Sequence, residues 1–110
     1  MAAIKEKSQT NTLVGTTLKD TLEGSGDDDL LQGFGGKDLL TGDDGDDTLE
    51  GGSGNDAIFA GDDDDFLNGG NGNDEFLLGT RYRVLGGGGR DRFFAYSGGN
   101  NTISGGEGSD

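Results

Sequence analysis

Aspartates that recur at a nearly fixed interval are the residues of this sequence best suited to chemistry. Each follows a glycine-rich stretch, as in GGSGNDAIF (Gly51 to Phe59) and GGNGNDEFL (Gly69 to Leu77). Aligned on the aspartate of GNDAIF, with steps of eight to ten residues, the series is Asp20, Asp28, Asp38, Asp47, Asp56, Asp65, Asp74, Asp91 and Asp110, with Arg83 and Asn101 in the same slot. Carboxylates are the ligands of hard cations, so the series predicts cation binding.

Composition excludes several other functions. The chain has 110 residues, a net charge of -14, and neither cysteine nor histidine, which removes thiolate metal sites and Ser-His-Asp triads. The acidic balance opposes nucleic acid as a partner. No apolar run reaches the ~18 residues of a membrane span, and the first residues lack the apolar stretch of a secretory signal peptide. We expect cations as partners, no nucleic acid and no enzymatic activity.

A large apolar residue lies two positions after each repeat aspartate, and it predicts the fold. The series is Leu22, Leu30, Leu40, Leu49, Ile58, Leu67, Phe76, Leu85, Phe93 and Ile103. Each repeat reads as a six-residue glycine turn followed by a three-residue strand, so two repeats make one coil and alternate strands stack into two short parallel sheets. Asn11 and Leu13 fill the same slots, so we expect residues 1–10 to be a leader or disordered tail and residues 11–110 to be the array, truncated at its C-terminal end.

This pattern, G-G-x-G-x-D-x-U-x with U a large apolar residue, resembles the RTX calcium-binding nonapeptide repeat. The resemblance implies an all-β, right-handed parallel β-roll, a β-solenoid whose glycine-rich turns bind calcium. Each ion would lie between two turns eighteen residues apart, held by repeat aspartates and main-chain carbonyls. The carbonyls implied are those of Gly33, Gly35, Gly36, Gly51, Gly52, Ser53, Gly54, Gly69, Gly70, Asn71 and Gly72. It also implies a module of a secreted toxin, protease, lipase or adhesin, exported from a Gram-negative or related bacterium by a type I system.

The two sides of such a roll would differ in calcium binding. One row carries Asp20, Asp38, Asp56, Asp74, Asp91 and Asp110, and the other carries Asn11, Asp28, Asp47, Asp65, Arg83 and Asn101. We therefore expect about five to seven ions, with fewer along the second row. Calcium is the expected metal, because it accepts many oxygen ligands at relaxed geometry whereas magnesium does not. The strongest sites should be Asp38/Asp56 and Asp56/Asp74. Asp20 and Asp65 should be weaker, because Leu18 and Asp63 replace a turn glycine.

Alternatives remain open for the rest of the chain. The segment from Arg81 to Arg92 could bind an anionic polysaccharide through Arg81, Arg83, Arg90 and Arg92, or Arg83 could simply neutralise neighbouring acids in place of an ion. The module could instead be a matrix or surface-layer component that self-associates through its open roll ends. A paired-carboxylate hydrolase is disfavoured, because nothing in the sequence points to a carboxyl group kept protonated for acid catalysis.

Overall fold

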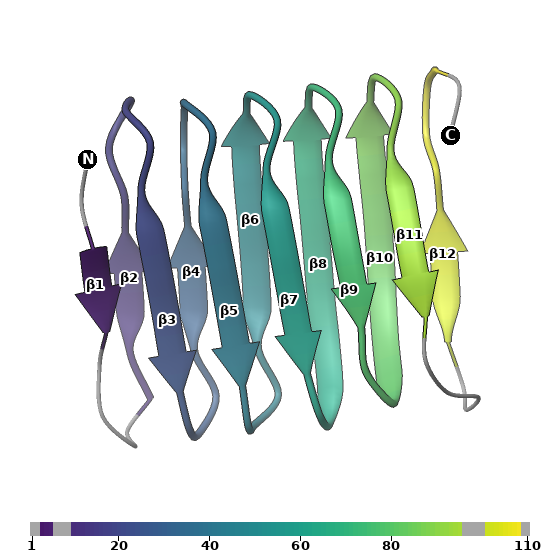
Figure 1. The fold of residues 1–110 in the computed structure, drawn as a ribbon. Coiled ribbons are helices and arrows are strands. Elements are labelled where there is room, and N and C mark those ends of the chain that lie inside the picture. Colours follow the sequence, from purple (N-terminus) through teal and green to yellow (C-terminus); the bar gives the residue numbers. More distant parts are fainter. Residues whose placement is uncertain (1–2, 6–9, 96–100, 109–110) are drawn as a thin grey trace.

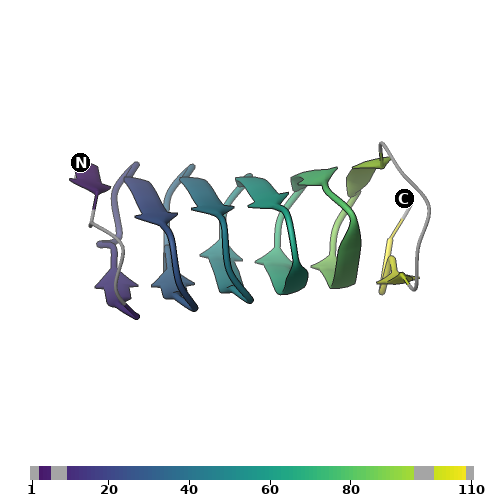
Figure 2. The same ribbon diagram turned by 90° about the horizontal axis from the view of Figure 1, so that it is seen from below.

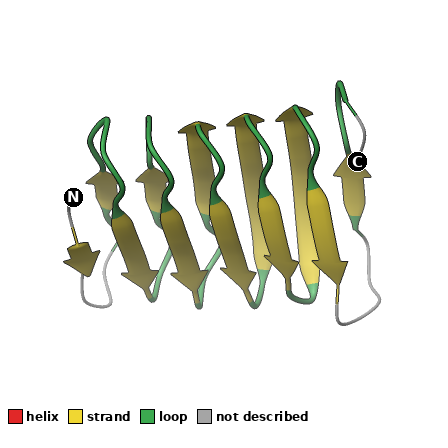
Figure 3. Ribbon diagram, turned by 45° about the horizontal axis from the view of Figure 1, so that its top comes forward, coloured by secondary structure: helices red, strands yellow, loops and turns green. Residues whose placement is uncertain are grey.

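The chain winds through two parallel sheets, one above the other (Figures 1 and 2). The computed structural model describes residues 3–5, 10–95 and 101–108. Strands and turns make up this part of the chain, with no helix in it (Figure 3). The strands are β1 (Ala3–Lys5), β2 (Thr12–Val14), β3 (Thr21–Ser25), β4 (Leu30–Gln32), β5 (Leu39–Asp43), β6 (Thr48–Ser53), β7 (Ala57–Gly61), β8 (Asp64–Asn71), β9 (Glu75–Leu78), β10 (Arg81–Gly88), β11 (Arg92–Ala95) and β12 (Thr102–Ser104).

Successive strands alternate between the two sheets, which makes the structure a β-solenoid. One sheet has the order β1-β3-β5-β7-β9-β11 and the other the order β12-β10-β8-β6-β4-β2, with parallel pairing in both. The turns that follow even-numbered strands form one edge of the roll, here called the upper edge as in Figure 1. The turns that follow odd-numbered strands form the lower edge. The predicted all-β parallel roll with two short sheets is confirmed.

A thin core lies between the sheets and is built from one or two buried apolar side chains of each of the strands β2 to β10. Leu40, Ile58 and Phe76 from one sheet are fully buried, as are Leu31, Leu49 and Leu67 from the other. At the far end the Phe76 and Phe93 rings stack with their centroids 5.0 Å apart. Because side chains alternate across a strand, the residues on either side of each core position face outward.

The register predicted around Asp28 is wrong by one residue. Asp29, not Asp28, lies in the repeat slot and is buried, while Asp28 is exposed. Likewise Leu31, not Leu30, pairs with Leu13 and Leu49 in the core. The steps through this region are then a uniform nine residues, so the predicted deletion and insertion here do not exist.

The register predicted around Arg83 is also wrong by one residue. Tyr82 pairs with Asp65 and occupies the aspartate slot, and the buried core residue is Val84, which pairs with Leu67. Arg83 and Leu85 face outward and are exposed. The single-residue deletion therefore falls in the turn between β9 and β10, where Asp74 and Tyr82 are only eight residues apart.

The segment before residue 11 contributes an edge strand, β1, which pairs with β3. Residues 1, 2 and 6–9 of that segment, and Asp110 of the predicted site, lie outside the described residues. Within the part that the structure describes, no helix is long and apolar enough to cross a membrane.

Candidate metal sites

The glycine-rich turns give the chain the shape that brings its repeat aspartates together. In the turn from Gly51 to Asp56, the second and fourth residues, Gly52 and Gly54, have φ of 97° and 117°. This left-handed region is open to glycine and costs other residues free energy. Asp63 occupies the fourth position of its turn with φ of 84°, so aspartate does adopt the conformation there. In the turn that contains Leu18, the fourth residue does not have a positive φ.

The repeat aspartates form a hydrogen-bonded ladder along each edge. On the upper edge, the main-chain N–H of Asp38 donates to Oδ1 of Asp56 over 2.8 Å, and the N–H of Asp56 donates to Oδ1 of Asp74 over 2.8 Å. On the lower edge, the N–H of Asp29 donates to Oδ1 of Asp47, and the N–H of Asp47 to Oδ1 of Asp65. Each carboxylate is thereby fixed against the coil before it.

The second oxygen of these carboxylates is buried without a hydrogen bond. This holds for the Oδ2 atoms of Asp38, Asp47, Asp56, Asp65 and Asp74. Their residues are at most 4% exposed, so water does not compensate for the lost hydration. A buried carboxylate oxygen without a hydrogen bond is costly and calls for a proton or a cation.

The space around each Oδ2 atom is a small cradle that depends on the first glycine of the turn. A Cβ atom built on Gly51 would lie 2.5 Å from Oδ2 of Asp56 and 2.8 Å from the carbonyl oxygen of Gly69 in the next coil. A Cβ on Gly33 would lie 2.5 Å from Oδ2 of Asp38 and 2.7 Å from the carbonyl oxygen of Gly51. A side-chain oxygen and a main-chain oxygen thus converge on the space that a Cβ atom would fill, and glycine leaves that space open.

The same cradle recurs along both edges of the roll. The glycine, aspartate and next-coil carbonyl are Gly69, Asp74 and Gly86; Gly86, Asp91 and Gly105; Gly24, Asp29 and Gly42; and Gly42, Asp47 and Ala60. Of the predicted carbonyl ligands, those of Gly33, Gly51 and Gly69 point into cradles. Those of Gly36, Gly52, Gly54, Gly70 and Gly72 face a glycine of the next turn. The carbonyl of Asn71 accepts a hydrogen bond from Gly54, and Gly35 pairs with Ser53 in an isolated bridge.

Two turns depart from this arrangement. The hydroxyl and N–H of Thr16 both donate to the carboxylate of Asp20, which therefore already has close hydrogen-bond donors. At Asp65, the glycine of the cradle is replaced by Ala60, whose methyl group is buried. The next lower-edge turn carries Tyr82 in place of an aspartate, so the lower row of cradles stops before this turn.

The pKa values of the cradle carboxylates reflect their burial. Loss of hydration raises the pKa of Asp47 and of Asp56 to about 6, although the hydrogen bond from the preceding coil lowers each in part. Burial raises the pKa of Asp74 to about 7 and that of Asp65 to about 8, with the neighbouring repeat aspartates adding repulsion. The pKa of Asp38 is raised for the same reasons. A bound cation would remove this penalty by favouring the charged form.

The available ligands fit a hard divalent cation, calcium in particular. The cradles present carboxylate and carbonyl oxygens and no nitrogen or sulfur. Within the described residues no three acidic side chains converge as a metal-binding group, so main-chain oxygens must complete each site. Calcium accepts such mixed, relaxed oxygen sets, whereas magnesium prefers strict octahedral geometry and retains water.

Sequence reasoning missed several residues of these sites. Asp29 and Tyr82 were missed because of the register error. The carbonyls of Gly42 and Gly86 were also missed, although each of these glycines is the first residue of its turn, as Gly33 is. Asp28 lies outside the cradle, where its Oδ1 accepts the N–H of Asp46 over 2.8 Å.

The four arginines are not gathered into one site. Arg81 and Arg83 line one open hollow with Asp64 and Asp65, whereas Arg90 lies in an upper-edge turn and Arg92 on the other sheet. The Nε atom of Arg81 lies 2.7 Å from Oδ1 of Asp64, and Arg92 lies near Glu75. Tyr82, not Arg83, occupies the repeat slot, so Arg83 does not take the place of an ion, although Arg81 and Arg83 both lie beside Asp64 and Asp65.

Comparison with known proteins agrees with the geometry of the turns. The family model for the RTX calcium-binding nonapeptide repeat (4 copies) matches residues 14–49, 41–76 and 85–110. No significant match was found among curated proteins or among solved structures. Because the matched ranges cover most of the sequence, and because the turns within them carry the repeated carboxylate cradle, the chain belongs to the RTX calcium-binding nonapeptide repeat family.

Proposed function

We propose that this chain is a calcium-dependent folding module of a larger secreted protein. The single observation that carries the proposal is the row of buried Oδ2 atoms without hydrogen bonds at Asp38, Asp47, Asp56 and Asp74, each beside a carbonyl oxygen of the next coil. RTX repeats bind calcium, and the family generally belongs to secreted bacterial proteins. The proposal adds that calcium decides whether the roll forms.

The charge of the repeat aspartates makes folding depend on calcium. At neutral pH an unfolded chain carries its aspartates ionised and hydrated, and folding must bury them one coil apart. Asp38, Asp56 and Asp74 then lie in succession along the upper edge with their carboxylates buried. Like charges at this spacing repel and lose hydration, and each divalent ion between two turns would reverse both penalties.

The number of ions follows from the cradles. Outside the turn of Asp20, the described residues provide cradles at Asp29, Asp38, Asp47, Asp56, Asp74 and Asp91. We propose about five to seven ions, with more on the upper edge than on the lower one. Asp38/Asp56 and Asp56/Asp74 are the strongest sites, because the aspartates of each pair are eighteen residues apart and both turns keep glycine at the first and fourth positions.

Counting bound ions tests this proposal. Isothermal titration calorimetry of the chelator-treated chain should give about five to seven calcium ions per chain, and magnesium should give little heat under the same conditions. Binding of fewer than two ions, or equal binding of both metals, would contradict it. A count within the expected range supports the cradles as the sites.

We propose that the module stays unfolded at the low calcium concentration of the cytosol and folds outside the cell, where calcium is millimolar, after type I export. The parent protein would be a toxin, protease, lipase or adhesin. We propose no catalytic role, because the raised pKa values belong to a repeated row of carboxylates and not to one distinct pair.

Binding of an anionic polysaccharide is the weaker candidate. Its four arginines are divided among three surfaces, and Arg81 is already paired with Asp64. Only Arg83 and Arg81 share a hollow, and Asp64 and Asp65 line that hollow too.

A further inference from the structure

Two large apolar side chains stand in solvent at the start of the upper edge. Leu18 is 61% exposed and Phe34 is 51% exposed, and they lie in adjacent turns of the same edge. Both occupy positions where other turns have glycine, such as Gly54 for Leu18 and Gly52 for Phe34. Phe34 adopts φ of 73°, which is costly for a bulky residue. Neither side chain is explained by the requirements of the fold.

Two lysines flank these apolar side chains. Lys19 and Lys37 are exposed, follow the fourth residue of the same two turns, and lie in neighbouring coils. No ion pair involves either lysine within the part of the chain that the structure describes. We call Leu18, Lys19, Phe34 and Lys37 the apolar-basic corner. The corner carries positive charge on a chain whose net charge is -14.

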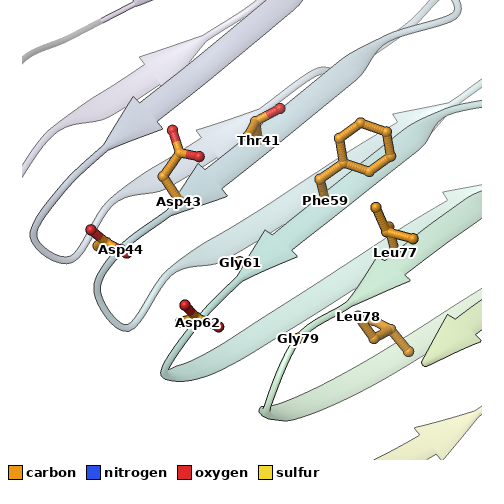
Figure 4. A pocket seen from close by; sticks show the side chains of 9 residues that line it. All are labelled: Thr41, Asp43, Asp44, Phe59, Gly61, Asp62, Leu77, Leu78 and Gly79. Atoms are coloured by element: carbon orange, nitrogen blue, oxygen red, sulfur yellow. The ribbon is translucent and has the colours of Figure 1, made fainter. Parts of the chain in front are cut away.

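A hollow with the opposite charge lies at the lower edge, on the outer face of β5, β7 and β9. It is open, has a volume of about 400 Å³, and is lined by Thr41, Asp43, Asp44, Phe59, Gly61, Asp62, Leu77, Leu78 and Gly79. In Figure 4 the side chains of Phe59 and Leu77 rise side by side from the sheet, and Asp44 and Asp62 lie at the turns beside them. We call this the acidic hollow.

The acidic hollow combines an apolar floor with an acidic rim. Phe59 is 37% exposed, and Leu77 beside it is half-buried. Asp44 and Asp62 occupy the same position in adjacent lower-edge turns and are exposed. No ion pair involves Asp44 or Asp62 among the described residues. The hollow suits an apolar group that carries positive charge next to it.

We propose that the apolar-basic corner of one molecule docks into the acidic hollow of a second copy. The ring of Phe34 and the side chain of Leu18 would cover Phe59 and Leu77, and the lysines would face Asp44 and Asp62. The two surfaces lie on opposite edges of the roll, so the corner and the hollow of one molecule cannot contact each other (Figure 1). Such a contact is heterologous and leaves a free surface on each partner, so it builds chains of molecules side by side.

Sedimentation velocity in calcium buffer tests this proposal over a range of protein concentrations. The unmodified chain should form species larger than a monomer, and their amount should fall as salt is raised. The double variant Leu18→Ser with Phe34→Ser should weaken association at least about tenfold, because it removes two apolar side chains from the contact. Leu85→Ser removes an exposed leucine from the other sheet and should leave association unchanged. Circular dichroism would verify that each variant folds with calcium.

Charge reversal and cross-linking give an independent check. Lys19→Glu with Lys37→Glu should abolish association, and mixing this variant with the Asp44→Lys, Asp62→Lys variant should restore it. A carbodiimide should join Lys37 to Asp62 between isotopically labelled and unlabelled copies. A chain that stays monomeric, or that associates equally well in the Leu18 and Phe34 variant, would overturn the proposal. Binding of the monomer to phosphatidylserine vesicles, lost in that variant, would assign the corner to a lipid surface instead and also overturn it.

Discussion

The main-chain N–H of Asp38 donates a hydrogen bond to Oδ1 of Asp56, one coil further along the chain, over 2.8 Å. This bond uses one oxygen of Asp56 to fix the spacing of two turns. It leaves Oδ2 buried beside Gly51 and the carbonyl oxygen of Gly69. One side chain thus joins two coils and directs its remaining oxygen into the buried space between turns, where a calcium ion would bind.

Replacing Asp56 by Asn should reduce calcium binding more than the same change at Asp65. Asp56 supplies the Oδ2 atom of its own cradle and borders the cradle of Asp38, and both cradles keep their glycine. Asp65 borders the cradle of Asp47, but its own turn has Ala60 in place of the cradle glycine. Asn keeps an oxygen that can accept the hydrogen bond of the preceding coil but loses the negative charge. Calorimetry should show a loss of up to two ions for Asp56→Asn and at most one for Asp65→Asn. A larger loss at Asp65 would contradict this assignment of cradles.

Replacing Gly51 by Ala should close one cradle without straining the backbone. Gly51 does not have a positive φ, but its new methyl group would meet Oδ2 of Asp56 and the carbonyl of Gly69. Gly35→Ala is the matched control, because its methyl group would lie 3.5 Å from the nearest atom, the Oγ of Ser53. We expect calorimetry to show the loss of one ion for Gly51→Ala and an unchanged count for Gly35→Ala. Equal counts in both variants would show that the cradles are not the sites.

The metal-free roll should be favoured by acid. The folded-state pKa values of Asp56, Asp74 and Asp65, about 6, 7 and 8, lie above the ordinary value of about 3.9. Protonation therefore stabilises the folded state fully below about pH 3.9, and this contribution is lost as the pH rises through about 6 to 8. In chelator, far-UV circular dichroism should gain β signal as the pH is lowered from 8 towards 4. A roll that instead forms on raising the pH would contradict these pKa directions.

Replacing Phe34 by Gly should stabilise the roll while it weakens self-association. Phe34 has φ of 73° and glycine adopts this conformation without steric cost, so the gain should be about 1 kcal/mol. Thermal or denaturant unfolding with calcium present would measure it. Reduced stability would show that the ring packs within its own chain, and the loss of association would then need another explanation.

The nine-residue period, together with its resemblance to the RTX repeat, predicted the fold class from the sequence. Glycine-rich turns alternate with short strands that each carry an apolar residue, and this alternation predicts stacked parallel strands. Among the described residues, the predicted register was wrong in DDDLL, around Asp29, and in RYRVL, around Tyr82, where adjacent residues of one type allow two alignments. A one-residue slip exchanges the two faces of a strand, and only the neighbouring coils decide which face is buried.

The candidate sites were less predictable than the fold. The positions of the aspartates follow from the period, but the role of each carbonyl depends on which oxygens face the next coil. The closing of one cradle by Ala60 is equally hidden, because alanine differs from glycine by a single methyl group whose position matters only after stacking. The acidic hollow was also hidden, because it joins residues from three separate strands.

The most direct test of the central claim is far-UV circular dichroism during a calcium titration at neutral pH, starting from a chelated chain, with magnesium as the control. The account predicts an unfolded spectrum in chelator, a cooperative gain of β signal with calcium, and no comparable gain with magnesium. A β spectrum already present in chelator at neutral pH would contradict it, because the roll would then tolerate its buried carboxylates without an ion.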